Sequence, residues 1–496
     1  MQLKEYIEQH EPINKPEEED ESDQTDPDDP RNEYSKTIEE PEDNDGENRH
    51  VKPEDRTSVK STIITIVKAM IGCGILNLPL IFKTLGIIPA CLFLILTITT
   101  TRLSIYFLMK CKDITQRYGY SMYAKLSFGA YGTFLMKFVI VMRTFGGSCV
   151  FLRVFGDVFH SLVSFFLPET LPQDSIYLSK NFYVIFIFFV LMPLIFKEDI
   201  SALKKFSFIG VLSIFIFLVA TITVFIYKWF NNEIQPFSYE MLWPNGTKIQ
   251  MFTTATAFMD CFTFQMNTFP IYLPLKPRTS KNMVRATFTS AMIAGIVYLL
   301  TGLMGFAMYR DNLNDVVLKY FKEDIVKYKQ QNFIISSVLF VSITAYFISA
   351  LLTMPLIFFA LKKNLITLIG FVEKKFKKKH TNKDIEEDTT LHVTMVNTQV
   401  IMASVQGVKK FLITLTAYVL TLLATLCVKK IIVINNIIGA TATNFITLLS
   451  PSTFYLMLEK SKNSCCNKTI ARFICVYGIS VLTTFIVIKI KTAFGL

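Results

Sequence analysis

Apolar stretches long enough to cross a lipid bilayer, about 20 residues each, recur along most of this chain. Backbone polar groups in lipid must be paired within the segment, so each stretch is expected to be an α-helix. The span at 182–197 is short, and the join between 411–428 and 431–457 is tight. Ten or twelve spans are therefore alternatives to the eleven spans that we place along the chain. We place the eleven at about 59–82, 86–109, 133–160, 182–197, 206–228, 250–274, 286–308, 333–361, 411–428, 431–457 and 470–491. The sequence therefore predicts an all-α integral membrane protein that needs the lipid bilayer.

Charge divides the chain into two parts. Residues 1–57 hold 21 of the 40 acidic residues but only 7 of the 51 basic ones. With few apolar side chains, this segment cannot offset the entropy cost of ordering, so we expect a disordered acidic tail before a transmembrane domain at 58–491. The basic residues of the remainder lie between apolar stretches, where they orient a membrane protein. We therefore predict no nucleic-acid partner.

Loop charge also predicts the orientation. With the N-terminus in the cytoplasm, the inner connections carry the denser lysine and arginine clusters, among them a long loop at 362–410 between the eighth and ninth spans. The sequon at Asn245 and Thr247 then faces outward, where glycosylation could occur, although a chance sequon is an equal alternative. The protein is expected in the plasma membrane or in a vacuolar or lysosomal membrane, and the sequence does not distinguish these locations.

The sequence contains no pattern for a metal, a cofactor or enzymatic chemistry. The nine cysteines include no CxxC pair, and none lies in a connection that we place outside. No mid-span histidine pair, HExxH or GxSxG occurs. We expect neither a disulfide nor a bound cofactor, no enzyme activity, and a chain that could act as a monomer.

Two spans are interrupted at mid-length. Gly72, Cys73 and Gly74 interrupt the first span, and a polar run from Asp260 to Gln265 interrupts the sixth. Non-helical backbone at this depth is tolerated only where it lines a cavity or is buried in protein. Because the breaks lie five spans apart, they indicate an inverted repeat of helices 1–5 against 6–10. The simpler alternative for the first break is a GxG helix-packing motif.

Broken helices expose backbone groups that suit an α-amino acid. Free N–H groups at a half-helix N-terminus favour a carboxylate, and free carbonyls favour an ammonium group. The side chains near the breaks are aromatic and few are acidic, which favours neutral amino acids, while a cationic substrate stays open through Asp260 or Asp157. With 45 phenylalanines in the chain, plain packing is the alternative for any one of them. The candidate substrate-binding residues are Ile71, Gly72, Cys73, Gly74, Gly147, Phe151, Phe262, Thr263 and Phe264.

Several segments resemble the amino acid/auxin permease family. They are 71–79 (IGCGILNLP), 120–132 with its SFGAYG core, 262–265 (FTFQ), 298–311, 353–355 (TMP) and 437–451. The matches follow the family order over 58–491 and are fairly specific only when taken together. The resemblance implies a LeuT-like fold of eleven helices and coupled amino acid transport.

One position departs from the sodium-coupled branch of that family. In that branch an Asn four residues before the first motif glycine helps to hold sodium, together with a helix 8 hydroxyl. Here the position is Lys68, while Thr353 keeps the apparent hydroxyl. The proton-coupled branch tends to carry Lys at this point, so the resemblance implies sodium independence. The alternative is a lysine that extends its ammonium group to the inner interface.

Other charges within spans are candidates for coupling or gating. Asp260 is the candidate proton carrier, because an intramembrane acid at a helix break is a functional hypothesis by default. Its alternative is to neutralise Lys68 or Arg143. Arg153 and Asp157 are four residues apart and could pair on one helix face. A structural role for this pair is favoured over a role in coupling. Arg143 could contact a substrate carboxylate or serve as a gate.

The sequence thus predicts a proton-coupled secondary transporter of amino acids. The main alternative is an amino acid sensor that signals through its acidic tail. An ion channel is disfavoured, because the chain lacks a filter sequence or charge ring.

Overall fold

The computed structural model describes residues 56–166, 179–196, 207–313, 316–380, 407–428, 431–461 and 465–494. All of them belong to one contact unit, Asp45–Leu496. The acidic tail expected at 1–57 lies almost wholly outside the described residues, as does the middle of the 362–410 loop.

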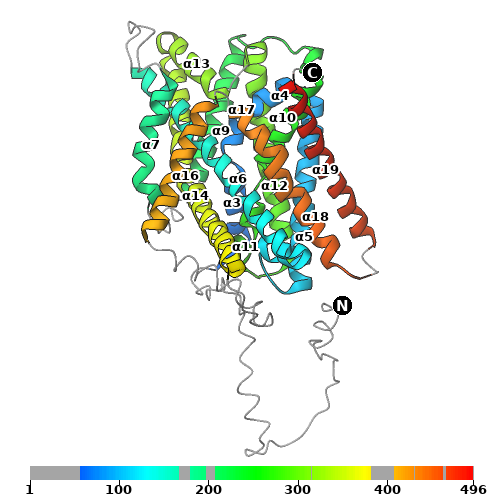
Figure 1. Ribbon diagram of the computed structural model, residues 1–496. Helices are drawn as coiled ribbons and strands as arrows, with labels where there is room; N and C mark the ends of the chain where they lie inside the picture. The colour runs from blue at the N-terminus through cyan, green and yellow to red at the C-terminus, as the bar shows by residue number, and fades with distance from the viewer. Residues whose placement is uncertain are drawn as a thin grey trace, which may run out of the picture. The chain divides into compact units, whose positions relative to one another are not determined.

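Helices account for nearly all of the described chain, and they lie side by side (Figure 1). In chain order they are α3 (Val59–Met70), η2 (Cys73–Asn77), α4 (Leu78–Leu85), α5 (Ile87–Thr115), α6 (Tyr120–Phe166), α7 (Lys180–Phe196), α9 (Ser207–Phe230), η4 (Tyr239–Leu242), α10 (Lys248–Cys261), η5 (Gln265–Asn267), α11 (Thr268–Tyr272), α12 (Ser280–Tyr309), η6 (Arg310–Asn312), α13 (Val317–Gln331), α14 (Phe333–His380), α16 (Gly407–Cys427), α17 (Ile431–Ile438), η8 (Gly439–Thr443), η9 (Phe445–Leu449), α18 (Ser450–Leu458) and α19 (Cys465–Phe494). Two short parallel strands, β1 (Thr57–Ser58) and β2 (Leu275–Lys276), pair beside the start of α3.

Eight helical segments of the described chain are long and apolar enough to cross a membrane. The pair Val59–Met70 and Cys73–Leu85 makes a ninth if it counts as one bent span, and α7 is a shorter apolar helix. The prediction of an all-α membrane protein is confirmed. The count of eleven and the inverted repeat stay predictions.

Two long helices organise the packing around the broken segments. α12 packs against α3, α4 and α5, while α14 packs against α6 and α9. α10 in turn contacts α4, α17 and η8. Around the breaks of the two interrupted segments, residues 73–79 and 261–265 are buried among these helices.

Two connections are more helical than a simple loop. α14 continues past residue 361 to His380, so the first part of the 362–410 connection is helical. Between α12 and α14, α13 is amphipathic and buries Val317, Phe321 and Ile325 on one face. The spacing of those apolar side chains at four residues explains why this connection folds as a helix.

Candidate functional site

The first break follows directly from Gly72 and Gly74. α3 ends at Met70, Ile71 and Gly72 are not helical, and the chain resumes as η2 and α4 with a bend of 50°. A methyl group on Gly74 would lie 2.5 Å from Sγ of Cys261, which is closer than real contacts allow. Glycine at this position therefore lets the first break approach the second.

The second break lies where the polar run predicts it. α10 ends at Cys261, residues 262–264 are not helical, and η5 and α11 follow. The side chain of Gln265 turns back and accepts a hydrogen bond from the backbone N–H of Phe264 at 2.9 Å. Thr263 donates its hydroxyl to the Met259 carbonyl at 2.8 Å.

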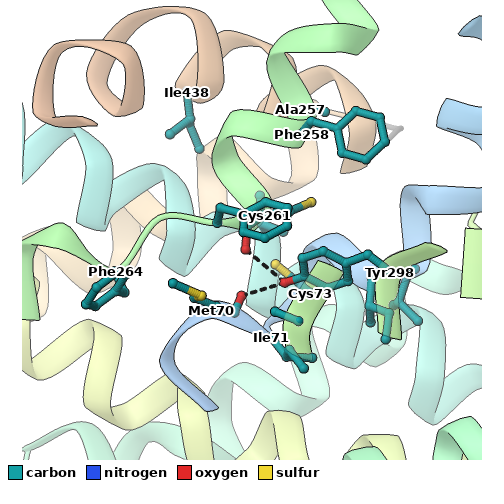
Figure 2. Packing of buried hydrophobic residues seen from close by; sticks show 14 of the residues in the cluster. Met70, Ile71, Cys73, Ala257, Phe258, Cys261, Phe264, Tyr298 and Ile438 are labelled. Atoms are coloured by element: carbon teal, nitrogen blue, oxygen red, sulfur yellow. Dashed lines mark hydrogen bonds between the residues drawn. The ribbon is translucent and has the colours of Figure 1, made fainter. Parts of the chain in front are cut away.

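Tyr298 of α12 joins the two breaks. Its hydroxyl lies 2.8 Å from the carbonyl oxygen of Met70 and 2.8 Å from that of Cys261, the last residues of α3 and α10 (Figure 2). One O–H proton is thus shared between two carbonyls that their own helices leave unpaired. The ring packs edge-to-face on Phe262 at 5.0 Å. The sequence reasoning noted Tyr298 only as the start of a family motif, because its contacts depend on how α12 is rotated.

Arg143 and Asp260 form an ion pair beside the second break. Arg143 Nη2 of α6 lies 3.0 Å from Asp260 Oδ1 of α10, and the Asp260 side chain is 8% exposed. The same carboxylate oxygen accepts a hydrogen bond from Thr443 at 2.8 Å. Thr443 ends η8, a π-helical segment, and such segments are frequent at functional sites. The pairing with Arg143 is the alternative that the sequence left open for Asp260. Thr443 lies within the family-like segment 437–451, but nothing in the sequence singled it out.

One face of α6 runs along the first break. Arg143, Gly147 and Phe151 are spaced by four residues on this helix. The Phe151 ring tip lies 3.7 Å from where a methyl group on Gly72 would stand. Ile71, Cys73, Phe151, Phe262, Thr263 and Phe264 are all buried. The structure thus brings the predicted substrate residues together, in a closed arrangement.

Lys68 lies against α9 and α14, away from Asp260's ion pair. A methyl group on Gly210 of α9 would be 3.2 Å from the Lys68 ammonium nitrogen and 3.8 Å from the Ser349 hydroxyl of α14. That hydroxyl donates to the Gly210 carbonyl at 3.2 Å. Thr353, one turn later, donates to the Ser349 carbonyl at 2.8 Å. The Lys68 nitrogen is buried, with no hydrogen-bond partner among the described residues. Ser349 is therefore a residue of this junction that the sequence reasoning missed.

Arg153 and Asp157 form a separate charged group farther along α6. Arg153 Nε lies 3.7 Å from Asp157 Oδ1, as the spacing of four residues predicts. Lys180 of α7 lies 3.3 Å from the same carboxylate oxygen, and Arg153 donates to the Asn181 side chain at 3.0 Å. The group ties α6 to the start of α7, which fits a structural role.

Two buried amides near the breaks have unsatisfied polar atoms. Both side-chain polar atoms of Asn77 in η2, and the Gln265 amide nitrogen in η5, have no hydrogen-bond partner in the part of the chain that the structure describes. Asn77 is 1% exposed and Gln265 is not exposed at all. Buried polar groups are normally paired, so these two are candidate contacts for a polar ligand. Neither was among the predicted binding residues.

The remaining predictions concern residues outside the breaks. Asn245 is exposed in the connection before α10, where Thr247 caps the helix, and its glycosylation stays a prediction. All nine cysteines are unpaired in the described chain. Across the described ranges, no group of three or more His, Cys, Asp or Glu could hold a metal ion.

Comparisons with known proteins agree on one family. The family model described as "Transmembrane amino acid transporter protein" matches residues 55–491. The chain is 27% identical over 340 residues to the Amino acid transporter AVT6C of Arabidopsis thaliana, covering 66% of this chain and 75% of that protein. It is 27% identical over 290 residues to the Sodium-coupled neutral amino acid transporter 7 of Bos taurus, covering 57% and 61%. It is 24% identical over 274 residues to the Vacuolar amino acid transporter 7 of Saccharomyces cerevisiae, covering 53% and 52%.

Proposed function

This chain belongs to the transmembrane amino acid transporter protein family, and from that premise we propose that it is a secondary active transporter that moves amino acids with protons and without sodium. The family match bears out the resemblance to the amino acid/auxin permeases. The coupling ion and the neutral substrate class are our proposals.

The observation that carries the proposal is the junction of the two breaks at Tyr298. The hydroxyl of Tyr298 holds the carbonyl ends of α3 and α10 together. Only a few residues after these carbonyl ends, the next helical segments begin: η2 after α3, and η5 after α10. Helix N-termini favour a carboxylate, and freed carbonyls favour an ammonium group. An amino acid carries both groups on one carbon, so it matches this pair of ends.

We assign the substrate to the buried residues around these ends. They are Ile71, Gly72, Cys73, Gly74, Gly147, Phe151, Phe262, Thr263 and Phe264, with the Asn77 and Gln265 amides as further polar contacts. Asp260 already accepts from Arg143 and Thr443. A neutral side chain therefore suits the site better than a cationic one, which would compete for that carboxylate.

Proton coupling is assigned to the ion pair of Arg143 and Asp260. Protonation of Asp260 removes the charge that holds Arg143, 3.0 Å away. Arg143 Nη1 lies 3.1 Å from where a methyl group on Gly147 would stand, so this change would leave an unpaired guanidinium on the face of α6 that runs beside the first break. Proton binding at one break would in this way change the packing at the other. Arg153 and Asp157 keep a structural role in this account.

Sodium independence rests on Lys68. Its ammonium group lies at the junction of α3, α9 and α14, beside the Ser349 hydroxyl and one turn from Thr353. A fixed cation there disfavours a second one by Coulomb repulsion in a low-dielectric setting. One relative is named a sodium-coupled transporter, so this part of the proposal needs a direct test.

The topology that we propose has eleven spans in a 5+5 inverted repeat, with α3–α4 and α10–α11 as the broken first and sixth spans. The N-terminus and the 362–410 connection lie in the cytoplasm. The membrane is the plasma membrane or a vacuolar or lysosomal one, and the chain works as a monomer.

The experiment is uptake by the purified full-length protein in liposomes, with a mixed set of labelled amino acids. Uptake of neutral amino acids above that of empty liposomes is the expected result. Tyr298→Phe should lower uptake, while Tyr418→Phe, which loses a hydroxyl contact to Phe188 away from the breaks, should keep it. Absence of uptake by protein shown to be folded would reject the transporter assignment.

A further inference from the structure

A basic groove lies between α5 and α12. It has a volume of about 570 Å³ and is at the end of the bundle where α5 finishes and α12 begins. Four cationic side chains line it, from Arg102 and Lys110 of α5 and from Lys281 and Arg285 of α12. Asp113 is the one acidic residue among its described lining residues.

No carboxylate in the described part of the chain neutralises the four cations of this groove. The Asp113 carboxylate already accepts from Ser280 at 2.7 Å and lies 2.8 Å from the Lys112 ammonium group. None of the four lining cations has a carboxylate within 4.0 Å in the described ranges of the chain. The first turn of α12 contains no acidic residue, so its helix dipole adds to the positive potential.

Aromatic rings hold two of the cations along the groove walls. The Arg102 guanidinium lies 4.9 Å from the Phe288 ring centre, and the Lys110 ammonium lies 5.8 Å from that of Tyr106. The Arg102–Phe288 contact also crosses from α5 to α12. Arg102 therefore has a defined place between the two helices.

An exposed apolar stripe continues from the charged end of the groove. On α12, Phe288, Met292 and Ile296 are 38%, 43% and 55% exposed. On α5, Ile95 and Leu92 are 61% and 62% exposed. The two helices are antiparallel here, because Ile98 lies opposite Gly295 while Arg102 lies opposite Phe288. From Arg285 to Ile296 the helix rises about 16 Å, roughly half the thickness of a hydrocarbon core.

We propose that this groove binds an anionic phospholipid whose headgroup carries more than one negative charge. The headgroup phosphates contact Arg102, Lys110, Lys281 and Arg285, and the acyl chains lie along the apolar stripe within one leaflet. A soluble phosphate compound would use the cations but leave the stripe unused. Basic pockets between transmembrane helices are known to suit such headgroups.

The test uses the purified full-length protein and a fluorescent phosphatidylinositol 4-phosphate, with three competitors. These are unlabelled phosphatidylinositol 4-phosphate, the soluble inositol 1,4-bisphosphate and phosphatidylcholine. The proposal predicts strong competition by the first and weak competition by the other two. Equal competition by the soluble compound would replace a lipid site with a soluble-phosphate site, and equal competition by phosphatidylcholine would remove the role of charge. Either result overturns the proposal.

Variants distinguish the contribution of the lipid headgroup to binding from that of the acyl chains. Arg102→Gln with Arg285→Gln should weaken lipid binding about 30-fold, from the usual contribution of a basic residue near an anionic membrane. Lys60→Gln with Lys410→Gln removes the same charge outside the groove and should leave binding unchanged. Ile296→Asn should weaken binding of the lipid but not of the soluble compound. Arg102→Lys with Arg285→Lys keeps the charge and should keep most of the affinity, which guards against loss of folding. The proposal is contradicted if the Lys60 and Lys410 variant loses as much lipid affinity as the Arg102→Gln and Arg285→Gln variant. It is also contradicted if the latter loses no lipid affinity.

Discussion

The guanidinium of Arg143 lies 3.0 Å from the carboxylate of Asp260, so an ion pair joins α6 to the end of α10 at the second helix break. Thr443 donates a hydrogen bond to the same carboxylate oxygen from η8. Three helical segments therefore meet at one carboxylate, next to the residues that we assign to the substrate.

Removing either partner of this pair should destabilise the protein. Asp260→Asn leaves a largely buried guanidinium without its counter-charge, which typically costs about 3–5 kcal/mol. Arg143→Gln should have a similar effect. We expect the double variant to be more stable than either single variant, because it leaves no unpaired charge. Thermal unfolding in detergent checks the order, with Asp113→Asn as an exposed control. A double variant less stable than both singles would contradict the pairing.

Tyr298→Phe should weaken the link between the two breaks. It removes the hydroxyl that two helix-end carbonyls share but keeps the ring packed on Phe262. A buried hydrogen-bonding group left without its partner costs about 1–3 kcal/mol. The measurement is the unfolding midpoint together with the substrate affinity.

The matched control for Tyr298 is Tyr418→Phe. Tyr418 is buried and donates to a single backbone carbonyl, that of Phe188, at 2.8 Å. It should lose comparable stability and keep substrate affinity. If both variants lose affinity equally, the hydroxyl of Tyr298 has no special part in the site.

Gly74→Ala should lower stability and uptake because its methyl group overlaps a neighbouring side chain. A second substitution should restore both. Its methyl group would lie 2.5 Å from Cys261 Sγ but 3.4 Å from Cys261 Cβ. Forcing an extra methyl group into a packed interior costs about 1–3 kcal/mol. Adding Cys261→Ala removes the sulfur, so the double variant should recover stability and uptake. Gly407→Ala, whose methyl group meets no atom of the described residues within 4 Å, is the control. A single Gly74→Ala variant with normal uptake would refute the close contact of the breaks.

Glu233 gives a prediction for pH dependence outside the spans. Burial alone would raise the pKa of Glu233, but hydrogen bonds from Lys327 and Tyr328 of α13 lower it below its ordinary value of 4.5. A carboxyl group with a lowered folded pKa adds stability above its unfolded pKa, and this is lost as the pH falls through the folded pKa. Lys327 is 47% exposed, so we expect Glu233→Gln to cost about 1 kcal/mol or less at neutral pH.

The Glu233 effect should shrink as the pH falls below 4.5, the ordinary pKa of the group, and disappear below its lowered folded pKa. Unfolding midpoints of Glu233→Gln and the parent protein, taken from neutral to acid pH, check this. Glu240→Gln, at an exposed position, should match the parent at every pH. A difference that grows on acidification would have the wrong sign for this contact.

The breaks were predictable because their signals are local. Gly72 and Gly74 weaken a helix whatever its neighbours are. The polar run that starts at Asp260 likewise interrupts an apolar span without reference to other helices. The pairing of Arg153 with Asp157 follows from helix geometry in the same way.

The contacts across helices were not predictable. Tyr298 reaches the breaks, and Ser349 reaches the Lys68 junction, only because α12 and α14 have particular rotations, which hydrophobic periodicity does not fix. Thr443 faces Asp260 from a π-helical segment, and a widened turn of this kind depends on packing against other helices. α13 was missed because its apolar face is too short to suggest a span.

The central claim is coupling to protons without sodium, and one measurement addresses it most directly. Full-length protein in liposomes is given a labelled neutral amino acid, and the pH gradient and the sodium concentration are varied independently, for the parent protein and for Lys68→Ala. The account predicts parent uptake that rises with an inward proton gradient and is unchanged by replacing sodium with potassium, and uptake by Lys68→Ala that responds to sodium. Parent uptake that requires sodium and ignores the proton gradient would contradict it.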